Sequence, residues 1–231
     1  EHNTSSWQRI DEGHLHYVIS PLHRFSSEQA RNQNDTVQRL ARFFGIEPFP
    51  ITYYSCADPV DLFRTRGFQM HPLLFVHPTG GMVDPGRQVW SGNDKDIYTH
   101  EIVHLFTEKK FGPRPDLLEE GLATLLGGSG EQPYAWHREN LRQLLVDPDI
   151  DVRDRCNPYV QDFINEHTHV PYVIGAVLCE SVLRRSGKEG LFKAMGSGTD
   201  AWTALAPYGI TPDTLGVVLR AELDRPVLPV L

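Results

Sequence analysis

The chain has 231 residues, of which 40% are hydrophobic and 23% are charged, and its formal net charge is −8. This composition is that of a globular protein with a core large enough for one domain or two smaller lobes. No stretch reaches the roughly 20 apolar residues of a membrane-spanning helix, and the dispersed acidic residues argue against a broad basic surface for nucleic acid.

The first half of the sequence mixes strand and helix patterns. Ser26 and Ser27 begin a run whose apolar residues recur at helical spacing as far as Gly45, a residue typical of helix ends. β-rich runs bounded by turn residues predict strands. The predicted elements are a strand from residue 14 that stops at Pro21, a helix that starts around Ser26-Ser27 and ends at Gly45, strands over 51–56 and 73–77, and a hairpin through Gly80-Gly81 and Asp84-Pro85-Gly86 that returns over 87–90.

From about residue 96 onward, helical patterns dominate. The predicted helices span 96–110, 116–127, 134–146, 171–186, 188–195 and 212–223. We therefore expect an α+β fold, with a mixed sheet and helices in the N-terminal half and a helical C-terminal half. The glycine-rich stretch 127–130 is the best candidate for a linker between two domains. The predicted domains are therefore residues 1–128 and 129–231.

The three cysteines are far apart in the sequence and form no Cys-x-x-Cys pair. A thiolate metal site is therefore not indicated. Cys179 lies in an apolar helical pattern and is expected to be a core residue. Cys56 and Cys156 both lie near turn residues, and a disulfide between them remains open.

The most informative segment is His100-Glu101-Ile102-Val103-His104. Histidines four residues apart on a helix share one face, where both imidazoles can bind one zinc ion at about 2.0 to 2.1 Å. Glu101 projects at an angle to that face, where it can take a proton from a zinc-bound water as a general base. Such a pattern arises by chance in roughly a few per cent of chains of this length, so its flanking sequence matters.

The flanking residues predict a buried helix around this motif. Asp94 or Asp96 can cap its start. Lys109 and Lys110 suit the negative end of the helix dipole, and the Gly-Pro pair that follows stops the helix. Apolar residues surround the polar trio, and buried imidazole and carboxylate groups need a partner, which a metal ion would supply.

A catalytic zinc site needs a third protein ligand. Glu119 and Glu120 lie in the first turns of the next predicted helix, where acids also suit the helix dipole. Glu120 shares a helix face with Ala123 and Gly127, and small residues let two helices approach closely. We therefore expect Glu120 to be the third ligand, with Glu119 or Thr124 as candidates to orient the imidazoles.

His-Glu-x-x-His followed by Leu118-Glu119-Glu120-Gly121-Leu122-Ala123 resembles the gluzincin zinc metallopeptidases, especially the aminopeptidase N family and its smaller relatives. The resemblance covers roughly residues 70–195. It implies a thermolysin-like catalytic domain with an active-site cleft between the two halves. It also implies a hydrolase of peptide or protein substrates whose Zn²⁺ is held by His100, His104 and Glu120. The family usually has asparagine or a similar residue where this chain has Glu119, and the interval to Glu120 is shorter than in the large aminopeptidases.

A second matching segment is Val170-Pro171-Tyr172-Val173-Ile174-Gly175, at the start of a predicted helix. The family has a Pro-Tyr-x-x-Gly segment here, so the resemblance implies that Tyr172 stabilises the oxyanion of the tetrahedral intermediate. A core aromatic residue at a helix start is the alternative for Tyr172. His169 is a further candidate for substrate contact.

A third comparison concerns the predicted hairpin. Aminopeptidases of the family carry Gly-x-Met-Glu-Asn upstream of the metal helix, and the glutamate binds the free amino group of the substrate. The resemblance implies substrate contacts at Gly81 and Met82, but Val83 and Asp84 follow them here. Either the amine-binding carboxylate is missing or displaced to Asp84, or the hairpin is an edge strand with which an extended peptide pairs.

Two other interpretations remain open: a zinc-containing domain that binds peptides or proteins without cutting them, and a helical interaction domain in which the motif arose by chance. A serine or cysteine hydrolase is less favoured, because the sequence has no Gly-x-Ser-x-Gly elbow. Internal and terminal peptide cleavage are not distinguished. The start at Glu1, together with the frequent export of small relatives of the family, favours a periplasmic or secreted protein.

Overall fold

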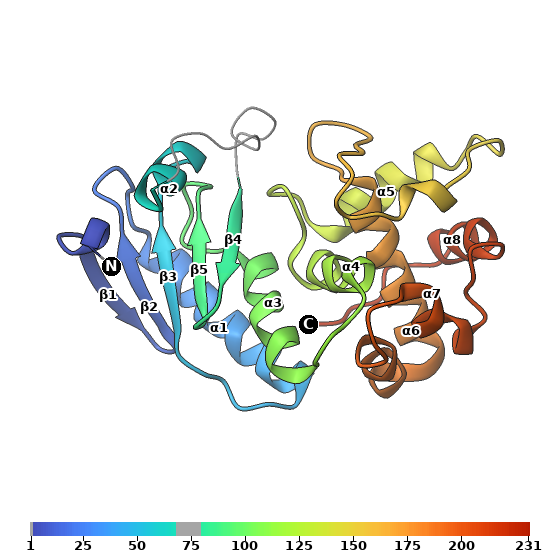
Figure 1. Cartoon of the computed structure of the whole chain (residues 1–231), viewed down its shortest axis with the longest axis horizontal. Coiled ribbons are helices and arrows are strands. Elements are labelled where there is room, and N and C mark those ends of the chain that lie inside the picture. The colour runs from blue at the N-terminus through green and yellow to red at the C-terminus, as the bar shows by residue number, and fades with distance from the viewer. Residues whose placement is uncertain (1, 68–79) are drawn as a thin grey trace. The chain divides into compact units, whose positions relative to one another are not determined.

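The computed structural model describes residues 2–67 and 80–231 (Figure 1). The chain forms two compact units, Glu1–Phe106 and Thr107–Leu231. This division differs from the predicted one at residue 128, because the helix over 116–127 belongs with the second unit. The first unit contains a five-stranded sheet with helices, and the described elements of the second are helices, which confirms the α+β class.

Two predictions concern the limits of this description. The strand predicted over 73–77 lies outside the described residues. Among the residues that the structure describes, no helix combines the length and hydropathy needed to cross a membrane.

The sheet of the first unit is mixed. Its strands are β1 (Gln8–Glu12), β2 (Leu15–Ile19), β3 (Ile51–Ser55), β4 (Gly81–Asp84) and β5 (Gln88–Ser91). They are ordered β1-β2-β3-β5-β4; the pairs β2–β3 and β3–β5 are parallel, and the two outer pairs are antiparallel. Since parallel neighbours need a crossover connection, helix α1 (Ser27–Phe44) joins β2 to β3.

The predicted strands near residues 14–20, 51–56 and 87–90 are confirmed as β2, β3 and β5. Most residues of β2 and β3 are buried, as expected for central strands. β1 was not predicted. Its residues are largely exposed, so the strand lacks the apolar pattern by which buried strands are recognised.

The predicted ends of α1 are confirmed. The side chain of Ser26 accepts a hydrogen bond from the backbone N–H of Gln29, and Gly45 ends the helix in the left-handed conformation with a φ of 64°. The last buried residue of α1, Phe44, stacks on Phe106 with 5.6 Å between ring centroids. Phe106 belongs to helix α3 (Thr99–Lys110), so α1 packs against the helix that carries the histidine motif.

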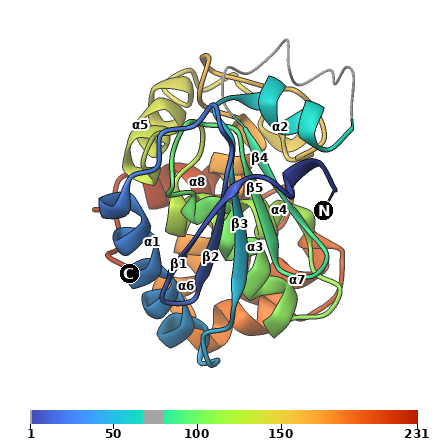
Figure 2. The same ribbon diagram turned by 90° about the vertical axis from the view of Figure 1, so that its left-hand side faces the viewer.

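A short helix, α2 (Pro59–Thr65), follows β3 and was not predicted. Asp58 caps it by accepting a hydrogen bond of 2.8 Å from the backbone N–H of Asp61. Asp-Pro was interpreted as the end of a strand, but proline also suits the first turn of a helix. Figure 2 shows the sheet face-on, with α1 and α3 lying behind the strands.

The helices of the second unit gather around α6, as Figure 1 shows. They are α4 (Asp116–Gly127), α5 (Tyr134–Leu144), α6 (Val170–Met195), α7 (Ala201–Leu205) and α8 (Leu215–Leu223). All were predicted except the short α7. The predicted separation of two helices near residue 187 is a break inside α6, where Gly187 adopts φ 64° and ψ −173°.

Helices α4 and α6 cross at two glycines. A Cβ atom added to Gly121 would lie 2.2 Å from the carbonyl carbon of Gly175, and one added to Gly175 would lie 2.1 Å from the carbonyl oxygen of Leu117. No side chain fits at either position without moving a backbone. The close approach of α4 to α6 therefore occurs through Gly121, a contact that the sequence did not predict.

A buried carboxylate joins α5, α6 and the C-terminal segment. Glu180 is fully buried. Its Oε1 accepts hydrogen bonds from Arg184 at 2.9 Å and from the backbone N–H of Leu228 at 2.7 Å. Its Oε2 accepts from the Tyr134 hydroxyl and from Arg138. Four donors compensate for the burial of this charge, which would otherwise be costly.

The glycine crossing generates a stability prediction. We expect Gly175→Ala to lower the free energy of unfolding by about 3 kcal/mol, because the new methyl group would overpack a backbone-to-backbone contact. Urea denaturation of the two proteins measures the difference. Gly112→Ala is the matched control, since a Cβ there meets no atom within 4 Å. A Gly175→Ala protein as stable as this control would contradict the crossing.

Candidate metal centre

Helix α3 brings the residues of the His-Glu-x-x-His motif together. The imidazole rings of His100 and His104 have centroids 5.0 Å apart and planes inclined by 73°. The potential ligand atoms of His100, Glu101 and His104 all lie within 4.8 Å of one another. These three residues form a group able to hold a metal ion.

The group lies in a largely apolar setting. His100 is 4% exposed and Glu101 8%, whereas His104 is half-buried. The neighbouring Ile102 and Val103 are fully buried. Two imidazoles and a carboxylate are costly to bury unless their polar atoms are satisfied, and coordination of a divalent ion offsets that cost. Nitrogen and oxygen donors of this kind suit zinc and several other transition metals.

The segment that leads into α3 is fixed by a buried aspartate. Oδ1 of Asp96 accepts a hydrogen bond of 2.6 Å from the Ser55 hydroxyl. Oδ2 accepts one of 2.6 Å from the backbone N–H of Ser26. The ring of His23 lies between two carboxylates, with Nε2 at 3.0 Å from Asp96 and Nδ1 at 2.8 Å from Asp94. The prediction that Asp94 or Asp96 caps α3 is wrong, because the helix begins beyond both.

Tyr98 connects the metal-binding helix with strand β4. The centroid of its ring lies 6.5 Å from that of His100. A Cβ atom added to Gly81 would lie 2.3 Å from the same tyrosine ring. Glycine at position 81 therefore lets Tyr98 pack directly on the strand, and it places Gly81 close to the metal group. Tyr98 belongs to none of the sequence motifs. Its position two residues before His100 is the only feature of the sequence that could have indicated a role near the metal group.

Strand β4 is the outermost strand of the sheet within the described ranges and pairs there with β5. This arrangement agrees with the edge-strand interpretation of the hairpin. Met82 packs against a hydrophobic cluster that includes Tyr54 and Trp90. Asp84 forms an ion pair of 2.8 Å with Arg66. Because this carboxylate already has a cationic partner, it is poorly suited to bind the amino group of a substrate.

The two glutamates of α4 belong to the second unit. Glu120 is half-buried. Glu119 is 7% exposed, and both of its carboxylate oxygens accept hydrogen bonds. The Thr107 hydroxyl at the end of α3 donates to Oε1 at 2.6 Å, and Arg114 donates to both oxygens. The carboxylate of Glu119 is thus engaged within the protein.

Tyr172 lies in the first turn of α6 and is half-buried. Its ring packs edge-on against His169, with centroids 4.4 Å apart. Nε2 of His169 lies 2.8 Å from the carbonyl oxygen of Val160. The ring of Phe163 also packs against that of His169, with centroids 4.7 Å apart. His169, 7% exposed, therefore supports the tyrosine ring more directly than it offers a surface to substrate.

Tyr159 is a residue near Asp116 and Glu120 that the sequence did not indicate. It is 77% exposed and belongs to the segment before α6. A hydrogen bond to Asp116 raises the pKa of Tyr159, with smaller contributions from burial and from the charges of Asp116 and Glu120. Tyr159 therefore lies close to the carboxylates in the first turns of α4.

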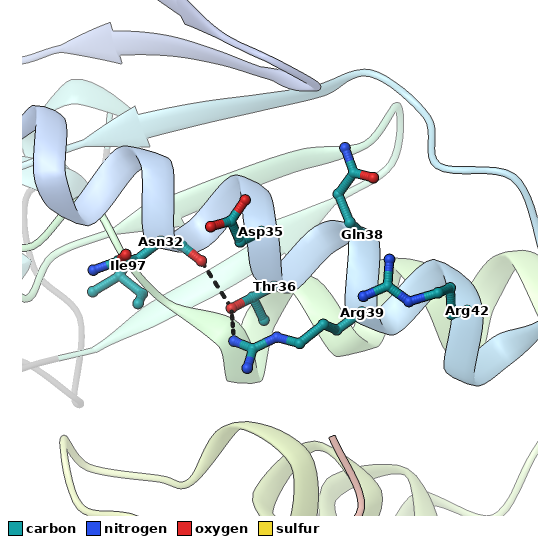
Figure 3. Close-up of a pocket in the computed structure, with 7 residues that line it drawn as sticks. All are labelled: Asn32, Asp35, Thr36, Gln38, Arg39, Arg42 and Ile97. Atoms are coloured by element: carbon teal, nitrogen blue, oxygen red, sulfur yellow. Dashed lines mark hydrogen bonds between the residues drawn. The ribbon is translucent and has the colours of Figure 1, made fainter.

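A hollow of about 540 Å³ lies along α1 (Figure 3). Arg39 donates a hydrogen bond of 2.8 Å to the Thr36 hydroxyl, which donates at 2.9 Å to the carbonyl oxygen of Asn32. The lining residues are Asn32, Asp35, Thr36, Gln38, Arg39, Arg42 and Ile97. None belongs to the metal-binding group, so this polar hollow is separate from the candidate centre.

The three cysteines are free thiols, and no disulfide joins Cys56 to Cys156. Burial raises the pKa of Cys56 and Cys179, and it raises that of Cys156 to about 12. All three thiols are therefore protonated at neutral pH. A protonated thiol is a poor nucleophile and a poor metal ligand.

Comparison of the sequence with protein-family models and with curated proteins gave no match. The resemblance to gluzincins therefore rests on the sequence motifs alone.

The ring of His23 generates a prediction of pH dependence. Burial alone would lower the pKa of His23, but hydrogen bonds to Asp96 and Asp94 outweigh it and raise the pKa. The protonated ring, held by two carboxylates, therefore stabilises the folded state. This stabilisation is fully present below about pH 6.5, the pKa of histidine in an unfolded chain, and is lost as the pH rises through the higher pKa of the folded state.

We expect the difference in unfolding free energy between wild type and His23→Gln to shrink as the pH is raised from 6 to 9. Urea denaturation at each pH measures it. His16→Gln serves as the control, since this histidine is 48% exposed in a surface pair with Asp11 and such pairs contribute little. Parallel pH profiles for wild type and His23→Gln would refute the role of this ring.

Proposed function

We propose that this protein is a zinc-dependent peptidase that hydrolyses peptide bonds with Glu101 as general base. The observation that carries the proposal is the group of His100, Glu101 and His104 on one largely buried helix, with ligand atoms within 4.8 Å. A shared metal ion would offset the cost of burying His100 and Glu101 beside the half-buried His104.

Glu120 is the proposed third ligand. Hydrolytic zinc sites commonly combine two histidines with one glutamate and leave a fourth position for water. Glu119, the other candidate, is engaged with Thr107 and Arg114. We assign Glu119 to this hydrogen-bond network and propose Glu120 as the ligand that α4 contributes.

Bound zinc would lower the pKa of a coordinated water and polarise the peptide carbonyl. Glu101 accepts a proton from the attacking water and delivers it to the leaving amine. At 8% exposure, its carboxylate interacts with nearby charge in a medium of low dielectric, which strengthens the interaction. Tyr172 donates a hydrogen bond to the carbonyl oxygen as negative charge develops there.

The substrate is proposed to be an extended peptide that pairs with β4, the outermost strand of the sheet among the described residues. An outer strand offers unpaired backbone groups, and β-strand addition is a common mode of peptide binding. Gly81 lies against Tyr98, close to His100. A peptide added to this strand would therefore run past the metal-binding group. Because Asp84 is paired with Arg66, recognition of a free amino terminus is not favoured at this position.

Metal content tests the three-ligand site. We expect about one zinc per chain in the purified wild type, measured by inductively coupled plasma mass spectrometry, and strongly reduced zinc in His104→Ala and Glu120→Gln. Glu108→Gln is the matched control, because Glu108 is an exposed residue on the same helix. Wild-type protein that stays free of metal after zinc is supplied would exclude the proposed function.

Hydrolysis tests the roles of the two proposed catalytic residues. We expect Glu101→Gln to retain zinc but to lose roughly a hundredfold to ten-thousandfold in kcat, as is typical of a lost general base. Tyr172→Phe should lower kcat by roughly a hundredfold or more, with unchanged zinc content. A library of quenched fluorescent peptides, with and without a chelator, gives the rates. A zinc-loaded wild type that cuts no peptide would favour a zinc-containing binding domain instead.

A further inference from the structure

The carboxylate of Glu119 is held at the junction of α3 and α4. The Thr107 hydroxyl donates a hydrogen bond of 2.6 Å to its Oε1, and Arg114 Nη2 donates one of 3.1 Å to the same oxygen. Arg114 Nε donates to Oε2. Thr107 is fully buried, and the side chains of Glu119 and Arg114 are 10% and 21% exposed. A charged network that is mostly withdrawn from water fixes the positions of its members more strongly than a surface ion pair does.

The donor of this network lies on the metal-binding face of α3. Thr107 follows His100 by seven residues and His104 by three, and residues at these intervals share one face of a helix. The Thr107 hydroxyl, which donates to Glu119, therefore lies about one helical turn, or roughly 5 Å, beyond His104 along the axis of α3.

The acceptor of the network directly precedes the proposed metal ligand. Successive side chains of an α-helix project about 100° apart around the helix axis. When Glu119 is held by Thr107 and Arg114, the rotation of α4 about its axis is fixed, and the direction in which Glu120 projects is fixed with it. On its other side, α4 is held against α6 by the contact of Gly121 with Gly175.

We propose that Glu119 is a positioning residue, which together with Thr107 and Arg114 orients Glu120 for metal coordination. This inference rests on the proposed function, since it requires Glu120 to be a zinc ligand. A coordinating side chain that is already oriented by its neighbours loses less conformational freedom when the metal binds. Removal of the orienting groups typically weakens metal affinity by about 10- to 100-fold.

Thr124, which the sequence suggested as a residue that orients the imidazoles, provides a contrast. It lies on the same helix as Glu119 and is 1% exposed, but its hydroxyl has no hydrogen-bond partner among the described residues. Thr107→Val and Thr124→Val therefore remove the same hydroxyl group from two buried sites, of which one holds Glu119 and the other does not.

The experiment is a zinc titration of the full chain in competition with a chromophoric chelator. We expect Thr107→Val and Glu119→Gln to bind zinc about 10- to 100-fold more weakly than wild type. Thr107→Ser, which keeps the hydroxyl, should restore affinity to near the wild-type value, and Thr124→Val should bind as wild type does. Circular dichroism confirms that each variant is folded, and Arg114→Gln replaces any network variant that is not.

The outcomes separate this inference from the proposed function. Wild-type affinity in Thr107→Val and Glu119→Gln, alongside lost binding in Glu120→Gln, would overturn the positioning role and leave the three-ligand site intact. The same conclusion follows if the network variants lose thermal stability but not zinc affinity. Absence of zinc binding by the wild type would overturn both proposals.

Discussion

The second unit depends on the contact between two helix backbones at Gly121 and Gly175. Because neither position tolerates a Cβ atom, α4 and α6 cross at a distance that larger residues would prevent. The residues proposed for chemistry lie beside this crossing: Glu120 immediately before one glycine and Tyr172 one turn before the other. The glycines within the two motifs are thus packing requirements that determine where the neighbouring polar side chains project.

In the first unit, polar groups are buried where they position the metal-binding helix. Asp96 ties the segment before α3 to β3, to the start of α1 and to His23. Phe106 packs on Phe44 of α1 near the other end of the helix. Hydrogen bonds of Asp96 fix the chain before α3, and the contact of Phe106 fixes the helix beyond the motif. The three motif residues therefore lie between two anchored points.

Much of this organisation could be predicted from periodicity and helix-end signals. The ends of α1, the hairpin of β4 and β5, and the break at Gly187 all follow from local sequence, because caps, turns and left-handed glycines are local effects. The grouping of His100, Glu101 and His104 was predictable for the same reason, since helix geometry alone brings residues four apart together.

What could not be predicted depends on partners distant in sequence. Asp96 was expected to cap a helix and instead binds three groups from residues 23–55, which no local pattern reveals. The contact of α4 with α6 through Gly121 was not predicted, because only the position of α6 decides which glycine is in contact. The roles of Tyr98 and Glu119 likewise emerge only when the strand or helix that each contacts is known.

The break in α6 has a mechanical consequence. Gly187 interrupts the helix with a φ of 64° and a ψ of −173°, so the turns on its two sides are not in rigid rotational phase. The part after the break can therefore place Leu191, Ala194 and Met195 in the core without setting the rotation of the face that carries Tyr172, Gly175 and Glu180. A long helix divided in this way packs its two parts as separate levers, each oriented by its own neighbours.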